Sequence, residues 1–229
     1  MRMRRPFAFR IHSMKTTIYV DGFNLYYRAL RKSPHKWLNL NALCEASLPK
    51  ESTVTAINYY TAPVSGRRNP TVPRDQNTYL RALQTLPNLQ IHYGSFQVAK
   101  RWMFLSQPVE FRPASLIHAM PNPEFACIIR TEEKTTDVNL ASHLVRDAFT
   151  GAFEHAVLIT DDTDLIEPLR IVVQEAKLPV TLLTPVDSPA VVLKRLATHV
   201  RHLRPYLGIS QFPNPIPGPK GPILTPADW

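Results

Sequence analysis

The chain has 229 residues, 44% of them hydrophobic, and its 27 basic against 18 acidic residues give a net charge of +9. This length and apolar content suit one domain with a buried core and argue against a disordered or fibrous protein. No uninterrupted apolar run is long enough to span a bilayer, so we expect a soluble, cytoplasmic protein whose basic surface favours polyanions such as nucleic acids. The two cysteines, Cys44 and Cys127, lie far apart in apolar stretches and are predicted to be reduced and buried.

The N-terminal residues 1–13 contain four arginines and no acid. They lack the apolar segment of a secretory signal, and a transit peptide or a basic arm for RNA are open alternatives. We interpret them as an upstream-extended start or a disordered basic extension, because Met14 directly precedes the first predicted strand.

The segment 16–30, TTIYVDGFNLYYRAL, predicts a strand followed by a helix. A β-prone run over 17–20 ends at Asp21, Gly22 allows a tight turn, and a helical pattern begins near Asn24. An acid thus lies at the C-terminal end of a strand, where parallel sheets bind their ligands.

The next part of the chain continues the alternation of helix and strand. Helices are predicted over 38–48 and 79–86, and strands over 53–61 and 89–96. Two regions are candidate contacts for a phosphate backbone: the loop and helix start near Arg74, and the basic, aromatic segment 97–125, which contains Arg101. Charges at a helix start, such as that of Arg74, are more often only solvated. We expect 97–125 to be an irregular excursion. Its basic and aromatic residues include Lys100, Arg101, Trp102, Phe104, Phe111 and Arg112.

The segment 131–149, TEEKTTDVNLASHLVRDAF, predicts a helix capped by Thr135 or Thr136. Asp137 lies in its first turn, where an acid alone most often complements the helix dipole. Lys134 lies three residues before Asp137, so we expect its ammonium beside the acids. There it could either hold a scissile phosphate or offset the repulsion between the acids. Glu133 is a further candidate acid of the same site.

The segment 157–169, VLITDDTDLIEPL, predicts a short buried strand that runs directly into three acids. Asp161, Asp162 and Asp164 repel one another unless a cation or protons relieve them, which favours a divalent-metal site. A structural alternative is a capping box formed by Asp164 and Glu167.

Beyond these acids, strands are predicted over 179–184 and 199–203 and a helix over 190–197. We expect one domain over 14–205, followed by a proline-rich extended tail over 206–229 whose Trp229 docks on this domain or on a partner. Short strands alternating with helices predict an α/β fold of three layers, α/β/α, around a parallel sheet. Walker, GxGxxG and GxSxG motifs are absent.

Three motifs in this order, DGFNLYY, EEKTTDVNLASHLV and LITDDTDLIEPL, resemble the NYN domain, in the LabA-like branch of the PIN-like nuclease superfamily. The resemblance runs from about residue 16 to 203 and implies a PIN-like (Rossmann-like) sheet of order 3-2-1-4-5. It also implies an acidic centre that binds Mg²⁺ or Mn²⁺. The residues at matching positions are Asp21, Asp137, Asp162 and Asp164, with Asn24 beside them. Asp161 departs from the family, which usually has a small residue there.

We therefore predict a metal-dependent endoribonuclease that hydrolyses RNA phosphodiester bonds at these aspartates. Asp21 and Asp162 are expected as direct ligands, and Asn24 as a positioning residue. Lys134, Arg74 and Arg101 are expected to contact the single-stranded or structured RNA. Two alternatives are a non-catalytic RNA-binding module and a phosphatase-type enzyme, and a homo-oligomer or a regulatory protein partner is left open.

Overall fold

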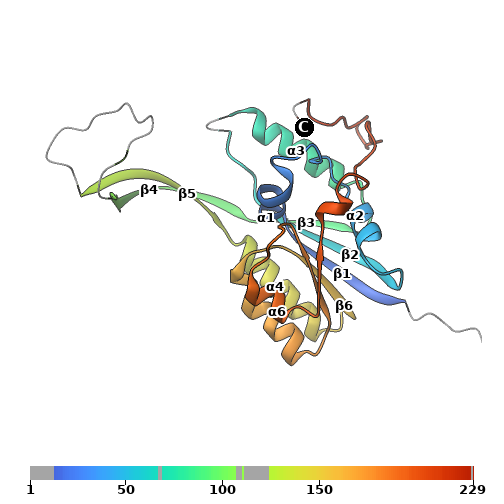
Figure 1. Ribbon diagram of the computed structural model, residues 1–229. Coiled ribbons are helices and arrows are strands. Elements are labelled where there is room, and N and C mark those ends of the chain that lie inside the picture. The colour runs from blue at the N-terminus through green and yellow to red at the C-terminus, as the bar shows by residue number, and fades with distance from the viewer. Residues whose placement is uncertain (1–12, 67–68, 107–109, 111–123, 228) are drawn as a thin grey trace, which may run out of the picture.

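Six parallel strands form the centre of the molecule (Figure 1). The structure is a computed structural model that describes residues 13–66, 69–106, 110, 124–227 and 229. The sheet has the order β3-β2-β1-β6-β7-β8. Its strands are β1 (Met14–Asp21), β2 (Ser52–Thr61), β3 (Leu89–Tyr93), β6 (His155–Ile159), β7 (Val180–Thr184) and β8 (His199–His202). The predicted order 3-2-1-4-5 is confirmed for the first five parallel strands, and the short final strand β8 extends it by one.

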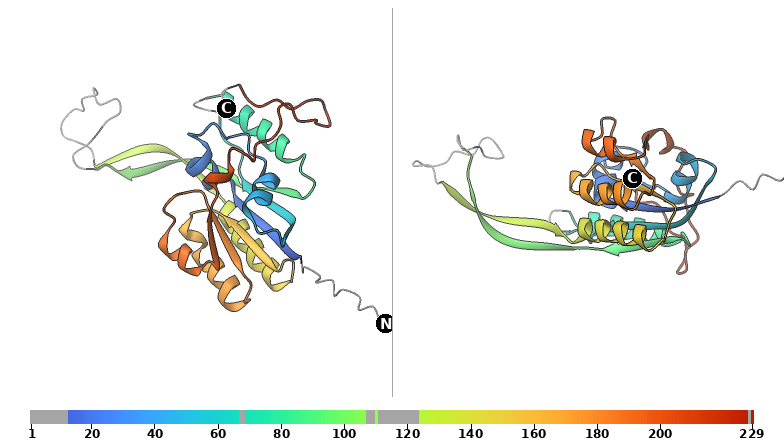
Figure 2. Two further views of the ribbon diagram at one scale, coloured as in Figure 1. Left: turned by 45° about the vertical axis from the view of Figure 1, so that its right-hand side comes forward. Right: turned by 90° about the horizontal axis from the view of Figure 1, so that it is seen from below.

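Helices cover both faces of this sheet (Figures 1 and 2), so the predicted three-layer α/β/α arrangement is confirmed. One face carries α1 (Gly22–Leu25) with its π-helical continuation Tyr26–Leu30, α2 (Leu40–Ser47) and α3 (Thr71–Leu83). The other carries α4 (Thr136–Phe149), α5 (Ile166–Arg170) with the π-helical turn Ile171–Glu175, and α6 (Val191–Leu196). Short 3₁₀ turns lie at Thr163–Leu165 and Arg204–Tyr206.

Strand β1 shows why the predicted strands are almost continuously apolar. Ile18 and Val20 are fully buried among residues of α1, α2 and α3, whereas Tyr19 between them is fully buried among residues of α4, α5 and α6. Successive side chains of a strand point to opposite faces, and both faces of this sheet are covered by helices. Two core clusters therefore meet at the central strands.

The predicted strand 89–96 is divided at Gly94. A Cβ atom there would lie 2.3 Å from Oγ1 of Thr136 and 2.7 Å from the carbonyl oxygen of Lys134, so only glycine fits at this crossing. Strand β3 ends before the glycine, and β4 (Ser95–Phe104) begins directly after it in a different sheet.

Strands β4 and β5 (Phe125–Lys134) form an antiparallel two-stranded ribbon that projects from the body of the molecule (Figures 1 and 2). The interpretation of 97–125 as irregular is therefore wrong for the described residues that form β4, because a regular ladder pairs Ser95 with Lys134 through to Phe104 with Phe125. Phe111 and Arg112 lie outside the described residues, as do residues 1–12 of the predicted N-terminal extension.

The described residues of the proline-rich segment after the last 3₁₀ turn form turns, bends and isolated β-bridges, such as that between Ile216 and Ile223, and the segment packs on the α1–α3 face of the sheet. Phe212, Ile216 and Ile223 are buried in the same core cluster as β1. Trp229 contacts the rings of Trp37 and Tyr79, with centroids 6.3 and 5.6 Å apart. The expected docking of Trp229 thus takes place on its own domain.

The two cysteines differ in their surroundings. Cys44 in α2 is fully buried, as predicted, but Cys127 in β5 is exposed, because it lies on the projecting ribbon and not against the core. Of the helices in the described ranges, none has the length and apolar character to cross a membrane.

Candidate metal centre

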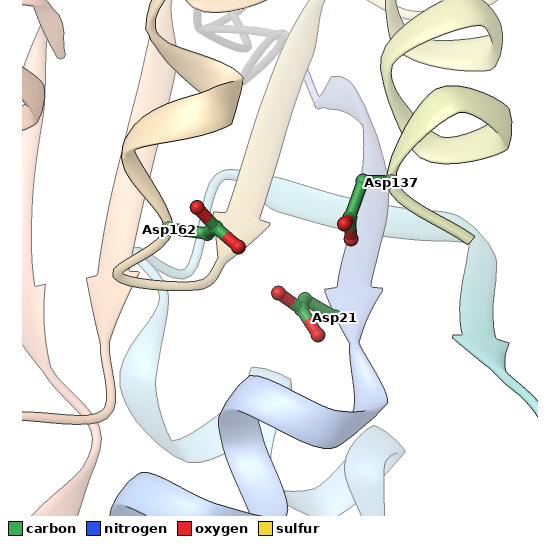
Figure 3. Close-up of side chains that lie close together, drawn as sticks. All are labelled: Asp21, Asp137 and Asp162. Carbon is green, nitrogen blue, oxygen red and sulfur yellow. The ribbon is translucent and has the colours of Figure 1, made fainter. Parts of the chain in front are cut away.

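Three carboxylates from separate elements meet at the C-terminal edge of the sheet (Figure 3). Asp21 ends β1, Asp162 follows β6, and Asp137 lies in the first turn of α4. One carboxylate oxygen of each lies within 4.8 Å of the others. Because β1 and β6 are direct parallel neighbours, acids 141 positions apart in the chain are brought to one point. We call these three residues the acidic trio.

Asp21 is the most buried member of the trio, at 4% exposure. Its Oδ1 accepts the backbone N–H of Asn24 at 2.9 Å, and its Oδ2 accepts the hydroxyl of Thr160 at 3.0 Å. Burial raises the pKa of this carboxyl to about 6, and the neighbouring Asp137 and Asp162 charges act in the same direction. A bound cation would relieve both effects.

Asn24 and Thr160 tie the two strand ends together. The Thr160 hydroxyl, besides donating to Asp21, accepts the backbone N–H of Asp162 at 3.0 Å, and Oδ1 of Asn24 accepts the backbone N–H of Asp161 at 3.0 Å. Asn24 therefore holds the loop that carries the acids, which suits the expected positioning role. Thr160 was missed in the sequence, although a polar residue at the end of a buried strand, directly before acids, is the signal that could have identified it.

Asp161 turns away from the trio. Its Oδ1 accepts the backbone N–H of Ala190, the residue before α6, at 2.8 Å. The carboxylate that departs from the family pattern thus serves as a helix-end contact, and it adds no fourth oxygen to the trio.

Asp162 also caps a helical turn. Its Oδ1 accepts the backbone N–H of Asp164 at 3.0 Å, at the start of the 3₁₀ turn. The predicted capping box is therefore wrong in its residues, because Asp162 provides the cap and Glu167 instead pairs with Arg170 at 2.7 Å. Asp164 is exposed and lies outside the trio. The pKa of half-buried Asp137 is raised first by burial, then by the charge of Asp162 and then by the charge of Asp164.

Glu133, near the end of β5, lies close to the trio. It is half-buried, and burial raises its pKa to about 7 against a lowering contribution from the Thr136 hydroxyl, with smaller raising contributions from the charges of Asp137 and Asp21. Its Oε1 is buried, and no hydrogen-bond partner for it exists in the described part of the chain. A buried oxygen without a partner is costly, so Glu133 is a candidate additional contact for a cation or its water.

Two of the three predicted phosphate contacts form ion pairs with acids other than the trio. Nζ of Lys134 pairs with Glu132 at 2.8 Å, and because neighbouring strand residues face opposite sides, Lys134 lies on the other face of the ribbon from Glu133. Its ammonium is thus engaged by Glu132, and its contact with a scissile phosphate stays a prediction. Arg101 lies on that same ribbon face as Lys134, and Arg74 in α3 is exposed and pairs with Asp75 at 3.3 Å.

The buried acids give the metal-free fold a predictable pH dependence. The folded-state pKa of Asp21, about 6, is raised above the value near 4 of an unfolded carboxyl. From about pH 4 to 6 the folded state thus binds more protons at this group, and its contribution to the free energy of unfolding falls as pH rises. Buried His155, whose pKa is lowered to about 4, contributes the opposite slope, so the comparison must be between variants.

We expect the melting temperature of Asp21→Asn minus that of the wild type, both measured in buffer with chelator, to increase as pH rises from 5 to 7.5. The His155 contribution cancels in this difference. A difference that stays constant or reverses across the range would show that Asp21 does not titrate as a buried carboxyl.

Comparisons with known proteins place this geometry in context. A solved structure from Vibrio parahaemolyticus, of a protein of unknown function, has a TM-score of 0.49 at 15% identity and covers 83% of this chain and 93% of its own. A 6-hydroxy-3-succinoylpyridine 3-monooxygenase, HspA, from Pseudomonas putida is 29% identical over 94% of this chain and 75% of its own length. Residues 15–204 match the NYN domain family. The chain therefore belongs to the NYN domain family, within the PIN-like nuclease superfamily.

Proposed function

We propose that this protein, as a LabA-like member of its family, is an endoribonuclease that hydrolyses RNA phosphodiester bonds with Mg²⁺ or Mn²⁺ at the acidic trio. The observation that carries the proposal is the meeting of three carboxylate oxygens within 4.8 Å of one another, from three separate elements. The ion pairs of Arg74, Arg130, Lys134, Arg146, Arg170 and Arg204 are all with acids outside the trio. Helix caps and dipole partners do not require such convergence.

The donor set fits a hard divalent cation. Mg²⁺ and Mn²⁺ prefer carboxylate oxygens, and Asp21 is fixed by two hydrogen bonds before any cation arrives. Bound there, the ion would neutralise the phosphodiester and lower the pKa of an attacking water. The partnerless Oε1 of Glu133 is a further oxygen in need of a charge or a donor.

Roles for the remaining residues follow from their positions. Asp21, Asp137 and Asp162 would hold the cation, and exposed Asp164 and half-buried Glu133 would orient its water. Asn24 keeps the loop after β6 in place through the Asp161 backbone. Arg74, Arg101 and Lys134 would contact the RNA backbone, and the net charge of +9 also attracts the polyanion. The enzyme would act on cytoplasmic RNA, alone or with a second copy or regulatory partner.

The response of the metal-free protein to Mg²⁺ and Mn²⁺, with RNA turnover followed in parallel, tests the proposal. A cation that binds only the folded state stabilises it by about 2.7 kcal/mol at a hundred times its Kd, so we expect a higher melting temperature and cleavage, both lost with chelator. Asp187→Asn is the matched control, because this acid is largely exposed and pairs with Arg204.

Three other outcomes have distinct meanings. Stabilisation and RNA binding without turnover would identify a non-catalytic RNA-binding module, and hydrolysis of phosphomonoesters with RNA intact would identify a phosphatase. If neither ion shifts the melting temperature at millimolar concentration and RNA stays intact, the trio is not a metal centre and the nuclease proposal fails.

A second candidate is oxygenation of a small heteroaromatic ring, which the 29% identity to the Pseudomonas putida monooxygenase over 94% of the chain favours. The test is oxygen consumption with 6-hydroxy-3-succinoylpyridine and a reduced nicotinamide as electron donor. Turnover of the pyridine with RNA left intact would favour this candidate over the nuclease.

A further inference from the structure

A cavity of about 100 Å³ opens between α1 and α3, next to the acidic trio. Gly22, which directly follows Asp21, belongs to its wall, so the cavity begins one residue from the most buried acid. Among the other lining residues are Phe23, Tyr26, Tyr59, Asp75 and Trp229. The sequence motif DGFNLYY therefore provides both an acid of the trio and a wall of this cavity.

The lining of the cavity suits an aromatic ring. Aromatic side chains surround it from α1, β2, α3 and the returning segment that ends at Trp229. Its volume is somewhat smaller than the 150 Å³ or so of an engineered cavity that holds benzene, but it is open on one side, so a larger ring can extend out of it. Stacking on aromatic side chains is tolerant of ring identity, so selectivity must come from polar groups.

Two polar groups of the lining are available to a ligand. Tyr59 is only 5% exposed, and its hydroxyl takes part in none of the hydrogen bonds found among the described residues. The Asp75 side chain is 12% exposed, and only its Oδ1 is engaged, by Arg74 at 3.3 Å. The amide of Gln76, by contrast, is already bonded to the backbone of Ala62 and Val64.

These groups define the ligand chemistry. An ionised carboxylate only accepts hydrogen bonds, whereas a tyrosine hydroxyl donates or accepts. The ligand should thus be a planar ring that presents N–H groups along one edge, with a further polar atom for the hydroxyl. Among nucleobases guanine matches best, because its N1–H and amino group are adjacent donors and O6 is an acceptor.

We propose that this cavity binds one base of the RNA that occupies the acidic trio, with guanine preferred. The inference rests on the proposed nuclease function. A Cβ atom at Gly22 would lie 2.6 Å from Cζ of Tyr59, so the tyrosine ring lies directly against the backbone that follows Asp21. This contact fixes the base-binding wall relative to the trio, and a base held there directs its own nucleotide toward the acids.

The test combines cleavage mapping with binding of mononucleotides. Short RNAs that differ only in one base are cleaved by the full chain in Mn²⁺, and the affinity for GMP, AMP, CMP and UMP is measured by calorimetry with the trio inactivated by chelator. We expect faster cleavage at guanine and tightest binding of GMP. Asp75→Asn and Tyr59→Phe keep the size of their side chains and should each reduce the guanine preference about tenfold, whereas Asp187→Asn should not change it.

The outcomes separate the base site from the nuclease. Cleavage without base preference, or a preference unchanged in Asp75→Asn and Tyr59→Phe, would overturn the base site and leave the nuclease intact. Intact RNA together with GMP binding that depends on Asp75 would keep the base site and remove the nuclease. Binding of 6-hydroxy-3-succinoylpyridine, and not of GMP, with the same dependence would overturn the base site in favour of a small-molecule ring.

Discussion

Asp162→Asn is expected to reduce RNA cleavage by more than about 100-fold and to leave the fold intact. The change removes one of the three charges that would hold the cation, and loss of residues that merely support metal ligands already costs about 10–100-fold. The cap survives, because an asparagine oxygen can still accept the Asp164 backbone N–H. Turnover in Mn²⁺ and the melting temperature of the metal-free variant are the two measurements.

The neighbouring change Asp161→Asn is a matched control. It removes the same charge one residue away, but Asp161 contacts the backbone before α6 and lies outside the trio. We expect Asp161→Asn to have a much smaller effect on turnover than Asp162→Asn. Equal losses would mean that the general negative field matters and not the trio, and wild-type turnover in Asp162→Asn would show that cleavage takes place elsewhere.

Trp37→Ala is expected to lower the free energy of unfolding by about 3–5 kcal/mol, the usual cost of truncating a buried large aromatic residue. Trp37 is 6% exposed and contacts the rings of Phe212, Tyr79 and Trp229. Its indole N–H donates to the carbonyl oxygen of Pro213 at 3.2 Å. The residue thus holds the proline-rich segment against α3, and its loss would release that segment as well as leave a cavity.

Trp102→Ala provides the comparison in urea unfolding. Trp102 lies on the projecting ribbon and is 72% exposed, so the same truncation should change the free energy of unfolding by no more than about 0.5 kcal/mol. Similar values for the two tryptophans would show that the proline-rich segment does not contribute to the stability of the domain.

The position of the acids at strand ends could be predicted because it depends on local pattern. The short β-prone runs before Asp21 and Asp162 and the helical spacing after Asp137 are visible within a few residues of each acid. The resemblance of three motifs to one family then supplied the strand order that brings them together. No long-range contact had to be guessed.

The faces of the ribbon could not be predicted in the same way. Lys134 and Glu133 are adjacent in sequence, and which of them faces the trio depends on the register of β5, where a shift of one residue exchanges the faces. That register is set by pairing with β4 and by the close crossing at Gly94, both of which are contacts between separate segments.

By itself the sequence determined the alternation of strands and helices and the three acids at their ends, because both depend on the conformational preferences of neighbouring residues. Tertiary structure alone decided that Asp161 turns to α6 while Asp162 joins the trio, and that the tail packs on Trp37. It also decided that an aromatic cavity lies beside the acids. These outcomes depend on which distant segments come into contact when helices cover both faces of the sheet. Local sequence patterns do not determine those contacts.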